Sequence, residues 1–167
     1  MAYRNKVFVS FDGDKDIHYY RLMRAWKQND NTSFDFLDAH DINTALDTST
    51  EETIKRRLRE RLSNSKVVVS LIGQQTRYLY RFLRWELEQS LSLGLPIIGV
   101  NLNGKRSQDI DRCPPVIRDE LVAYASFNSA ILQYALENWP AEFNRLKSQG
   151  VIGPRYYKEG VYRRLGL

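Results

Sequence analysis

The chain has 167 residues, of which 43% are hydrophobic and 27% charged, with a formal net charge of +5. This length and composition are typical of one globular domain and exclude a disordered chain, and a single cysteine excludes an internal disulfide framework. No apolar run is long enough to cross a membrane, and the start, MAYRNKVFVSF, lacks the pattern of a secretory signal peptide, so we expect a cytoplasmic protein.

Predicted strands and helices alternate along the chain. Short runs rich in β-branched and aromatic residues predict strands at 6–11, 34–40, 66–73, 95–102 and about 124–127. Apolar residues at helical spacing, together with capping signals, predict helices within 14–29, 49–62, 74–94 and 128–149. The tyrosine-rich tail after residue 150 is predicted to be irregular.

The first predicted helix has a clear apolar stripe. Tyr19, Leu22, Met23 and Trp26 recur at i, i+3, i+4 and i+7, which predicts that they form its buried face. Asp14 is the expected N-cap, because a short acidic side chain before an apolar stripe accepts from the first free N–H groups.

The second predicted helix, 49–62, begins with Ser49 and Glu52 in capping-box spacing. It carries the basic run KRRLRER at 55–61, which we interpret as the solvated face of the helix. Single-strand binding usually combines basic with aromatic residues, and this run contains no aromatic, so we do not expect a nucleic-acid partner.

The fold class follows from the strand at 66–73, KVVVSLIG. Its continuous apolar run predicts burial on both faces, as at the centre of a parallel sheet. The alternation of strands and helices therefore predicts an α/β, flavodoxin-like three-layer fold with about five parallel strands and helices on both faces. Such sheets bind ligands outside the carboxyl ends of their strands, here after Phe11, Asp38, Gly73 and Leu102.

Several common sites are excluded by their missing motifs. The loop SFDGDKD after the first strand has neither GxGxxG nor GxxxxGK[ST], which argues against a Rossmann dinucleotide site and a P-loop. With only His18, His40 and Cys113, common zinc spacings are absent, and we expect no metal. The chain has no GxSxG nucleophile elbow, and Cys113 before two prolines is expected to be a small loop or core residue.

Three aspartates, Asp12, Asp14 and Asp16, follow the first strand. An acidic loop at this place can hold a magnesium ion and accept a phosphoryl group, but that chemistry also calls for a lysine at the end of a later strand. Lys105 instead lies several residues into its loop. Helix capping and turn formation are the alternative roles for these aspartates, and we favour them.

Glu86 stands out in the helix segment RFLRWELEQS. At about 100° per residue, Leu83 and Leu87 lie on one side of this helix, and Glu86 falls about 60° from Leu83, beside Phe82. Glu86 is therefore predicted at the shoulder of the apolar stripe, in a helix that starts near the ligand crevice. Geometry alone leaves open a structural role, because glutamates at such positions are common.

Five segments together carry a resemblance to a known family. They are KVFVSF with its acidic loop, FDFLDAHD, SKVVVSLIGQQT, RFLRWELEQSLSLG and PIIGVNL. The chain resembles the TIR and TIR-like family, and most closely the bacterial TIR-like group that includes the sensor proteins of Thoeris anti-phage defence. The resemblance covers about residues 5–102 and implies a single TIR-like domain over 1–167, with C-terminal helices and a tail over 103–167.

This resemblance implies an activity and a site. Glu86 falls on the glutamate that catalytic members need to split NAD at its nicotinamide–ribose bond, which yields ADP-ribose or a cyclic variant as a signal. NAD is then a substrate, no cofactor is expected, and a downstream effector that responds to the product is an expected partner. The further substrate-binding residues that it implies are Ser10, Phe11, Asp12 and Asp38. Phe82, beside Glu86 on the same helix, is a further predicted substrate-binding residue.

A non-catalytic signalling function is the alternative hypothesis. TIR domains often act by assembling with one another, and the resemblance therefore also implies self-association. The basic helix at 55–61 and the tyrosine-rich tail are the expected contact surfaces for such a signalling module.

Overall fold

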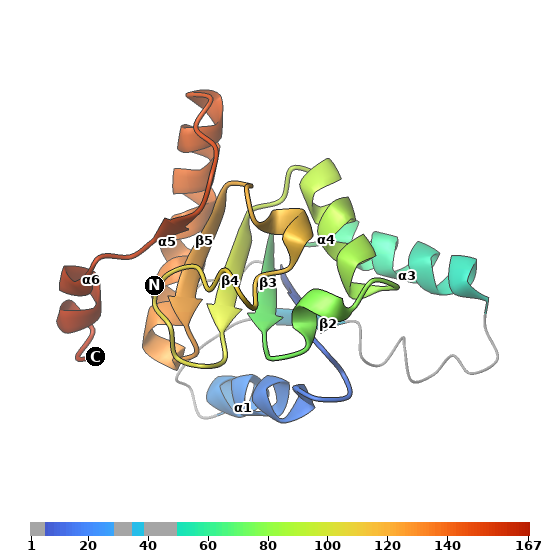
Figure 1. Ribbon diagram of the computed structural model, residues 1–167, viewed down its shortest axis with the longest axis horizontal. Helices are drawn as coiled ribbons and strands as arrows, with labels where there is room; N and C mark the ends of the chain where they lie inside the picture. Colours follow the sequence, from blue (N-terminus) through green and yellow to red (C-terminus); the bar gives the residue numbers. More distant parts are fainter. Residues whose placement is uncertain (1–5, 29–34, 39–49) are drawn as a thin grey trace.

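A parallel β-sheet forms the centre of the protein in a computed structural model, which describes residues 6–28, 35–38 and 50–167 (Figure 1). The strands are ordered β2-β1-β3-β4-β5-β6, and each neighbouring pair is parallel. The first five strands have the order of flavodoxin-like sheets, which confirms the predicted fold class. The strands are β1 (Lys6–Ser10), β2 (Asp35–Asp38), β3 (Val67–Ile72), β4 (Ile97–Asn101), β5 (Val122–Ser126) and β6 (Arg155–Tyr156).

Helices cover both faces of the sheet. Buried residues of α1 (Ile17–Gln28) and α5 (Ser129–Ser148) share one apolar core cluster with the sheet. Those of α3 (Glu51–Ser63) and α4 (Leu83–Ser92) share a second cluster on the opposite face. The shorter elements are the 3-10 turns η1 (Thr76–Tyr78) and η2 (Pro115–Ile117) and the C-terminal helix α6 (Glu159–Arg164).

The central strand β3 is buried along its whole length, as its continuous apolar sequence predicts. It pairs with β1 so that Ser70 lies beside Ser10, the last residue of β1. In the view of Figure 1, α1 is drawn below the arrowheads of β3 and β4, and its buried residues pack on the same sheet face as α5. The carboxyl edge of the sheet therefore has a different helix on each side, α4 on one and α1 on the other.

The buried face of α1 differs from the prediction. Tyr20 and Met23 are buried, whereas Leu22 is 48% exposed. Tyr19 and Trp26 are partly buried because their rings pack on Phe127, beside the sheet. The apolar stripe is thus rotated toward Tyr20, because contacts with aromatic side chains outside the helix decide which side faces the core.

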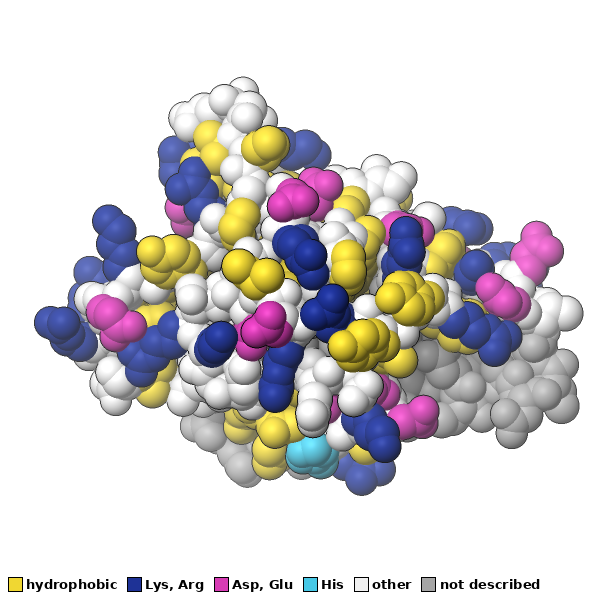
Figure 2. Space-filling view, viewed as in Figure 1, with side chains coloured by type: hydrophobic (Ala, Val, Ile, Leu, Met, Phe, Trp, Pro, Cys, Tyr) yellow, Lys and Arg dark blue, Asp and Glu magenta, His cyan; other side chains and the backbone are white. Residues whose placement is uncertain are grey.

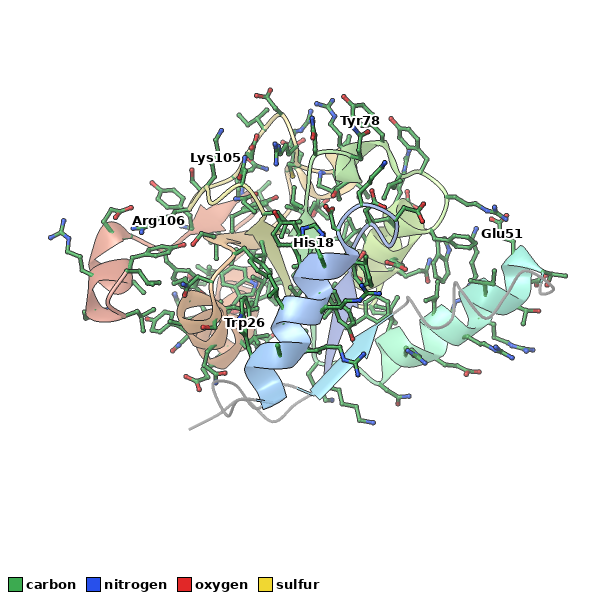
Figure 3. The ribbon with its side chains drawn as sticks, turned by 90° about the horizontal axis from the view of Figure 1, so that it is seen from below. His18, Trp26, Glu51, Tyr78, Lys105 and Arg106 are labelled. Atoms are coloured by element: carbon green, nitrogen blue, oxygen red, sulfur yellow. The ribbon has the colours of Figure 1, made fainter. Side chains whose placement is uncertain are left out.

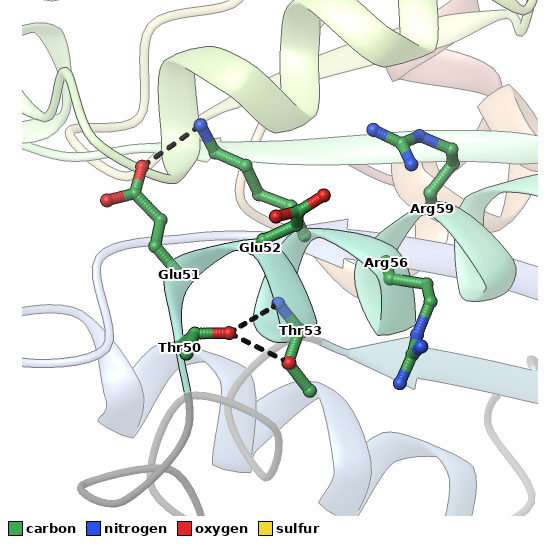
Figure 4. A pocket seen from close by; sticks show the side chains of 7 residues that line it. Thr50, Glu51, Glu52, Thr53, Arg56 and Arg59 are labelled. Atoms are coloured by element: carbon green, nitrogen blue, oxygen red, sulfur yellow. Dashed lines mark hydrogen bonds and ion pairs between the residues drawn. The ribbon is translucent and has the colours of Figure 1, made fainter.

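The start of α3 also differs in detail. The predicted cap Ser49 lies outside the described residues, and Thr50 is the N-cap, with its hydroxyl accepting the N–H of Thr53 (3.2 Å) (Figure 4). Apolar residues Ile54, Leu58 and Leu62 are buried, as their spacing predicts. The basic residues between them are exposed or half-buried, so the run 55–61 does form a mostly solvated face.

The tail is more regular than predicted. Its residues Arg155–Tyr156 add the short strand β6 to the edge of the sheet, parallel to β5, and α6 follows. Arg106, in the loop after β4, joins the tail to the sheet: its Nη1 lies 2.7 Å from Glu159 Oε2 and its guanidinium lies 4.1 Å from the Tyr162 ring centre. The tail is therefore anchored to a loop at the carboxyl edge.

Candidate functional site

Glu86 lies in the first turn of α4 and is only 3% exposed. Its N–H donates to the carbonyl oxygen of Phe82 (2.8 Å), and Leu83 and Leu87 are buried beside it. The helix geometry predicted a shoulder position, but the structure turns Glu86 fully inward against the sheet. A carboxyl group in such a place needs a polar partner, because burial removes the water that would otherwise solvate it.

Ser10 supplies that partner. It is the last residue of β1, fully buried, and its Oγ donates to Glu86 Oε2 over 2.7 Å. This length is typical of a hydroxyl that donates to a carboxylate. The bond joins residues 76 positions apart in the sequence and fixes the carboxyl group of Glu86 over the carboxyl end of β1.

Two further serines line the same interface between α4 and the sheet. Ser90 Oγ donates to the backbone oxygen of Glu86 (2.7 Å), which is a local bond within the helix. Ser70 is the neighbour of Ser10 across the sheet, and its buried Oγ has no hydrogen-bond partner among the described residues. No sequence motif marks Ser70 as a site residue, and it was not among the predicted ones.

The residues after β1 contact the start of α1. The Phe11 ring stacks on Tyr20 of α1 (4.8 Å between centroids) and packs on the core of the α1 face. Asp12 is buried, and its Oδ1 accepts the N–H groups of Asp14 (3.0 Å) and Lys15 (3.2 Å). Asp12, and not Asp14, therefore shapes the turn into α1, which begins only at Ile17.

Phe82 and Asp38 complete the expected set. Phe82 is the N-cap residue of α4 and packs, partly buried, on the core of the α3 and α4 face, with the Arg81 guanidinium 4.9 Å from its ring centre. Asp38 is the last residue of β2, and its backbone pairs with Val9, next to Ser10. The side chain of Asp38 lies outside the described part of the structure.

A crevice of about 560 Å³ opens at the same edge of the sheet, on the α1 side. It lies between the start of α1 and the loops after β3 and β4, and Glu86 is not among its lining residues. Figure 3 shows His18, one of its lining residues, in the first turn of α1. The crevice is lined by Lys15, Asp16, His18, Tyr19, Gly73, Gln74, Gln75, Leu102, Asn103 and Arg112.

Asp16 is the buried carboxyl group of this crevice. It is 7% exposed, and its Oδ2 has no hydrogen-bond partner among the described residues. Burial raises the pKa of Asp16, and the nearby charge of Asp12 raises it further. Gly73 makes room for it: a Cβ at this position would lie 2.2 Å from Asp16 Oδ2, so the carboxyl group of Asp16 would have to shift.

Lys105 does not complete a phosphoacceptor site with the aspartates after β1. Its Nζ lies 3.7 Å from Asp109 Oδ2, in its own loop. Within residues 6–28, 35–38 and 50–167, no group of three or more His, Cys, Asp or Glu side chains is arranged to hold a metal ion. In the same ranges, no helix combines the length and the apolar character needed to cross a membrane.

The strand order and the two helical layers define a domain of the flavodoxin-like class, with a buried carboxyl group at the start of α4. The sequence matches the family described as Thoeris protein ThsB, TIR-like domain, over residues 8–107. The chain therefore belongs to this family, whose members take part in Thoeris anti-phage defence. A crystal structure of a conserved protein from Enterococcus faecalis V583 is similar over 98% of each chain, with 15% sequence identity and a TM-score of 0.48.

Proposed function

We propose that this TIR-like domain cleaves NAD at the nicotinamide–ribose bond, in the cytoplasm, with Glu86 as the catalytic carboxylate. The observation that carries the proposal is the position of Glu86: buried in the first turn of α4 and hydrogen-bonded to Ser10 at the carboxyl end of β1. Ligands of flavodoxin-like folds bind at this edge. Family membership adds support, since some TIR-like domains process NAD.

The chemistry needs only one carboxylate. The bond between C1′ of the ribose and the nicotinamide nitrogen breaks, the nitrogen keeps the electron pair, and neutral nicotinamide leaves without a proton. The positive charge that develops on the ribose is stabilised by the negative charge of Glu86, as a carboxylate does in glycosidases. Water then adds at C1′ and loses a proton, or a nitrogen of the adenine closes a ring.

Ser10 is a positioning residue in this scheme. A free glutamate has several rotatable bonds, and a carboxylate that stabilises charge must be held before the reaction begins. The 2.7 Å bond from Ser10 Oγ to Glu86 Oε2 provides that constraint from a rigid strand. Among the remaining expected residues, Phe82 lies next to Glu86, whereas Phe11 and Asp12 contribute to the fold around the start of α1.

The test is nicotinamide release from NAD by the purified chain, with and without extract of phage-infected bacteria as the trigger. We expect Glu86→Gln to lower the rate about 100-fold or more, because the neutral amide cannot stabilise the charge. Glu88→Gln is the matched control: Glu88 is on the same helix but exposed, and it pairs with Arg84 (2.9 Å). Equal nicotinamide release by the wild type, Glu86→Gln and Glu88→Gln would overturn the proposal.

A second candidate function is self-assembly through protein–protein contacts. It is supported by the exposed basic residues of α3, of which Arg56 and Arg59 also line a surface hollow at the start of that helix (Figure 4). Sedimentation at increasing concentration tests it. We expect association of the wild type and of Glu86→Gln, and its loss when Arg56 and Arg57 are both changed to glutamate, while the same change at Arg21 and Arg24, exposed arginines of α1 outside both expected contact surfaces, leaves association intact.

A further inference from the structure

The crevice on the α1 side has binding features that the proposed reaction at Glu86 does not use. Its two carboxyl-end loops and the first turn of α1 enclose about 560 Å³, a volume within the usual range for small-molecule pockets. Its lining residues Tyr19 and Leu102 pack on the core cluster of α1, whereas Leu83 and Leu87, beside Glu86, belong to the cluster of α4. The two places are thus on opposite sides of the sheet edge.

Asp16 gives the crevice an acceptor in need of a donor. Buried polar atoms in proteins are nearly always hydrogen-bonded, and an unpartnered one is costly, so an exception calls for an explanation. Asp16 Oδ2 is such an exception, although the residue lines an open crevice. Gly73 leaves the space that this carboxyl group occupies, because a Cβ at position 73 would force the group to shift. A hydroxyl or amino group of a bound ligand would supply the missing donor.

Two basic side chains, Lys15 and Arg112, line the crevice together with the imidazole ring of His18. Arg112 and His18 lower the pKa of Asp16, but burial and Asp12 outweigh them. Neither Lys15 nor Arg112 makes an ion pair with another side chain in the described ranges. Figure 2 shows Lys and Arg side chains close to the single cyan histidine. The 12-residue helix α1 also begins here, and the positive end of its dipole favours an anion.

An aromatic wall completes the crevice. The rings of His18 and Tyr19 lie 4.1 Å apart, and Tyr19 packs edge-on against Phe127 (5.1 Å), which fixes its orientation. Flat heterocycles stack on such rings. The amide side chains of Gln74, Gln75 and Asn103 add donors and acceptors around the opening.

From these groups we propose that the crevice binds a nucleoside 5′-monophosphate as a second nucleotide site, separate from Glu86. Arg112 and Lys15 hold the phosphate beside the start of α1, a ribose hydroxyl donates to Asp16, and the base lies along Tyr19. A bare anion would leave Asp16 without a donor, and an uncharged nucleoside would leave the cations without a partner. The ligand therefore needs both a phosphate and a hydroxyl-bearing sugar.

The experiment is calorimetric titration of the purified full chain with AMP, with adenosine and inorganic phosphate as comparison ligands. We expect AMP to bind more tightly than either. Arg112→Gln should weaken AMP about tenfold or more without changing adenosine, because a charged hydrogen bond to the phosphate is lost. Asp16→Ala should weaken both AMP and adenosine. The control Arg164→Gln removes an exposed arginine of α6 and should bind AMP like the wild type.

The Glu86→Gln variant separates this site from the proposed NAD site, because NAD itself contains an AMP group. AMP binding that is unchanged in Glu86→Gln and weakened in Arg112→Gln supports the second site, whatever the outcome of the nicotinamide assay. The proposal is overturned if the wild type does not bind AMP, if inorganic phosphate binds as tightly as AMP, if Arg112→Gln binds like Arg164→Gln, or if Glu86→Gln loses AMP.

Discussion

Glu86 and Asp16 are two buried carboxyl groups at one edge of one sheet, and they are held in different ways. Glu86 receives the Ser10 hydroxyl at 2.7 Å and lies inside the interface between α4 and the sheet. Asp16 rests against the bare backbone of Gly73, with one oxygen unpartnered, and lines an open crevice. The first arrangement holds a carboxyl group in one orientation, and the second leaves one carboxyl oxygen without a hydrogen-bond donor among the described residues.

The largest effect that separates the two groups is expected at Gly73. Gly73→Ala places a Cβ 2.2 Å from Asp16 Oδ2, so we expect a loss of about 3 kcal/mol in the free energy of unfolding, measured with urea. Adding Asp16→Ala removes the three atoms that collide and should recover most of this loss. Gly160→Ala, where a Cβ meets nothing within 4 Å, is the control, and equal stability of Gly73→Ala and Gly160→Ala would contradict the close fit.

A smaller effect is expected at the Glu86 site. Ser10→Ala removes the donor to a buried carboxyl group and should cost about 2 kcal/mol of unfolding free energy. In a double-mutant cycle with Glu86→Gln, the two substitutions should be coupled, because one removes the donor of this bond and the other removes the charge of its acceptor. Ser63→Ala removes an exposed hydroxyl that donates to the backbone oxygen of Arg59, and it should change stability by less than about 0.5 kcal/mol. Additive effects of Ser10→Ala and Glu86→Gln would argue against the bond.

The smallest effect is a pH trend at Asp16. Because its folded pKa is raised, folding favours the protonated form: the stabilisation is complete below the unfolded pKa, near 3.8, and is lost as pH rises through the folded pKa. Asp16→Asn cannot ionise. Relative to the wild type, this variant should therefore gain stability as pH rises from about 3.8 toward the folded pKa and then level off. The nearby groups Asp12, His18 and Arg112 are unchanged in both proteins, and parallel stability–pH curves would contradict the prediction.

The sequence predicted the layers of the fold better than its edges. The apolar run of β3 has no helical or alternating period, so burial on both faces was the natural interpretation, and the structure confirms it. The stripe of α1 was misplaced by one position because Phe127, a residue distant in sequence, covers Tyr19 and Trp26. The strand β6 has only two exposed residues, Arg155 and Tyr156, and it forms because β5 offers a free edge and not because of a local pattern.

The sequence predicted the placement of Glu86 better than that of Asp16. Helix geometry brought Glu86 near the core, although its full burial depends on Ser10, which lies 76 positions away. Asp16 looked like one of three turn-forming aspartates, and nothing near it in the sequence indicates that Gly73 would press against its carboxyl group. A glycine that ends a buried strand was the one available signal for this contact.

The family match ends at residue 107, but the sheet and its apolar core continue beyond that residue. Strand β4 pairs along its whole length with β5, and Leu136 and Trp139 of α5 share one core with Val69 and Val100. A fragment cut at 107 would leave that side of the sheet uncovered, with its apolar side chains in water. The matched segment thus lacks β5 and α5, which pair with and pack on it, and transplanting it into another protein requires taking the C-terminal third as well.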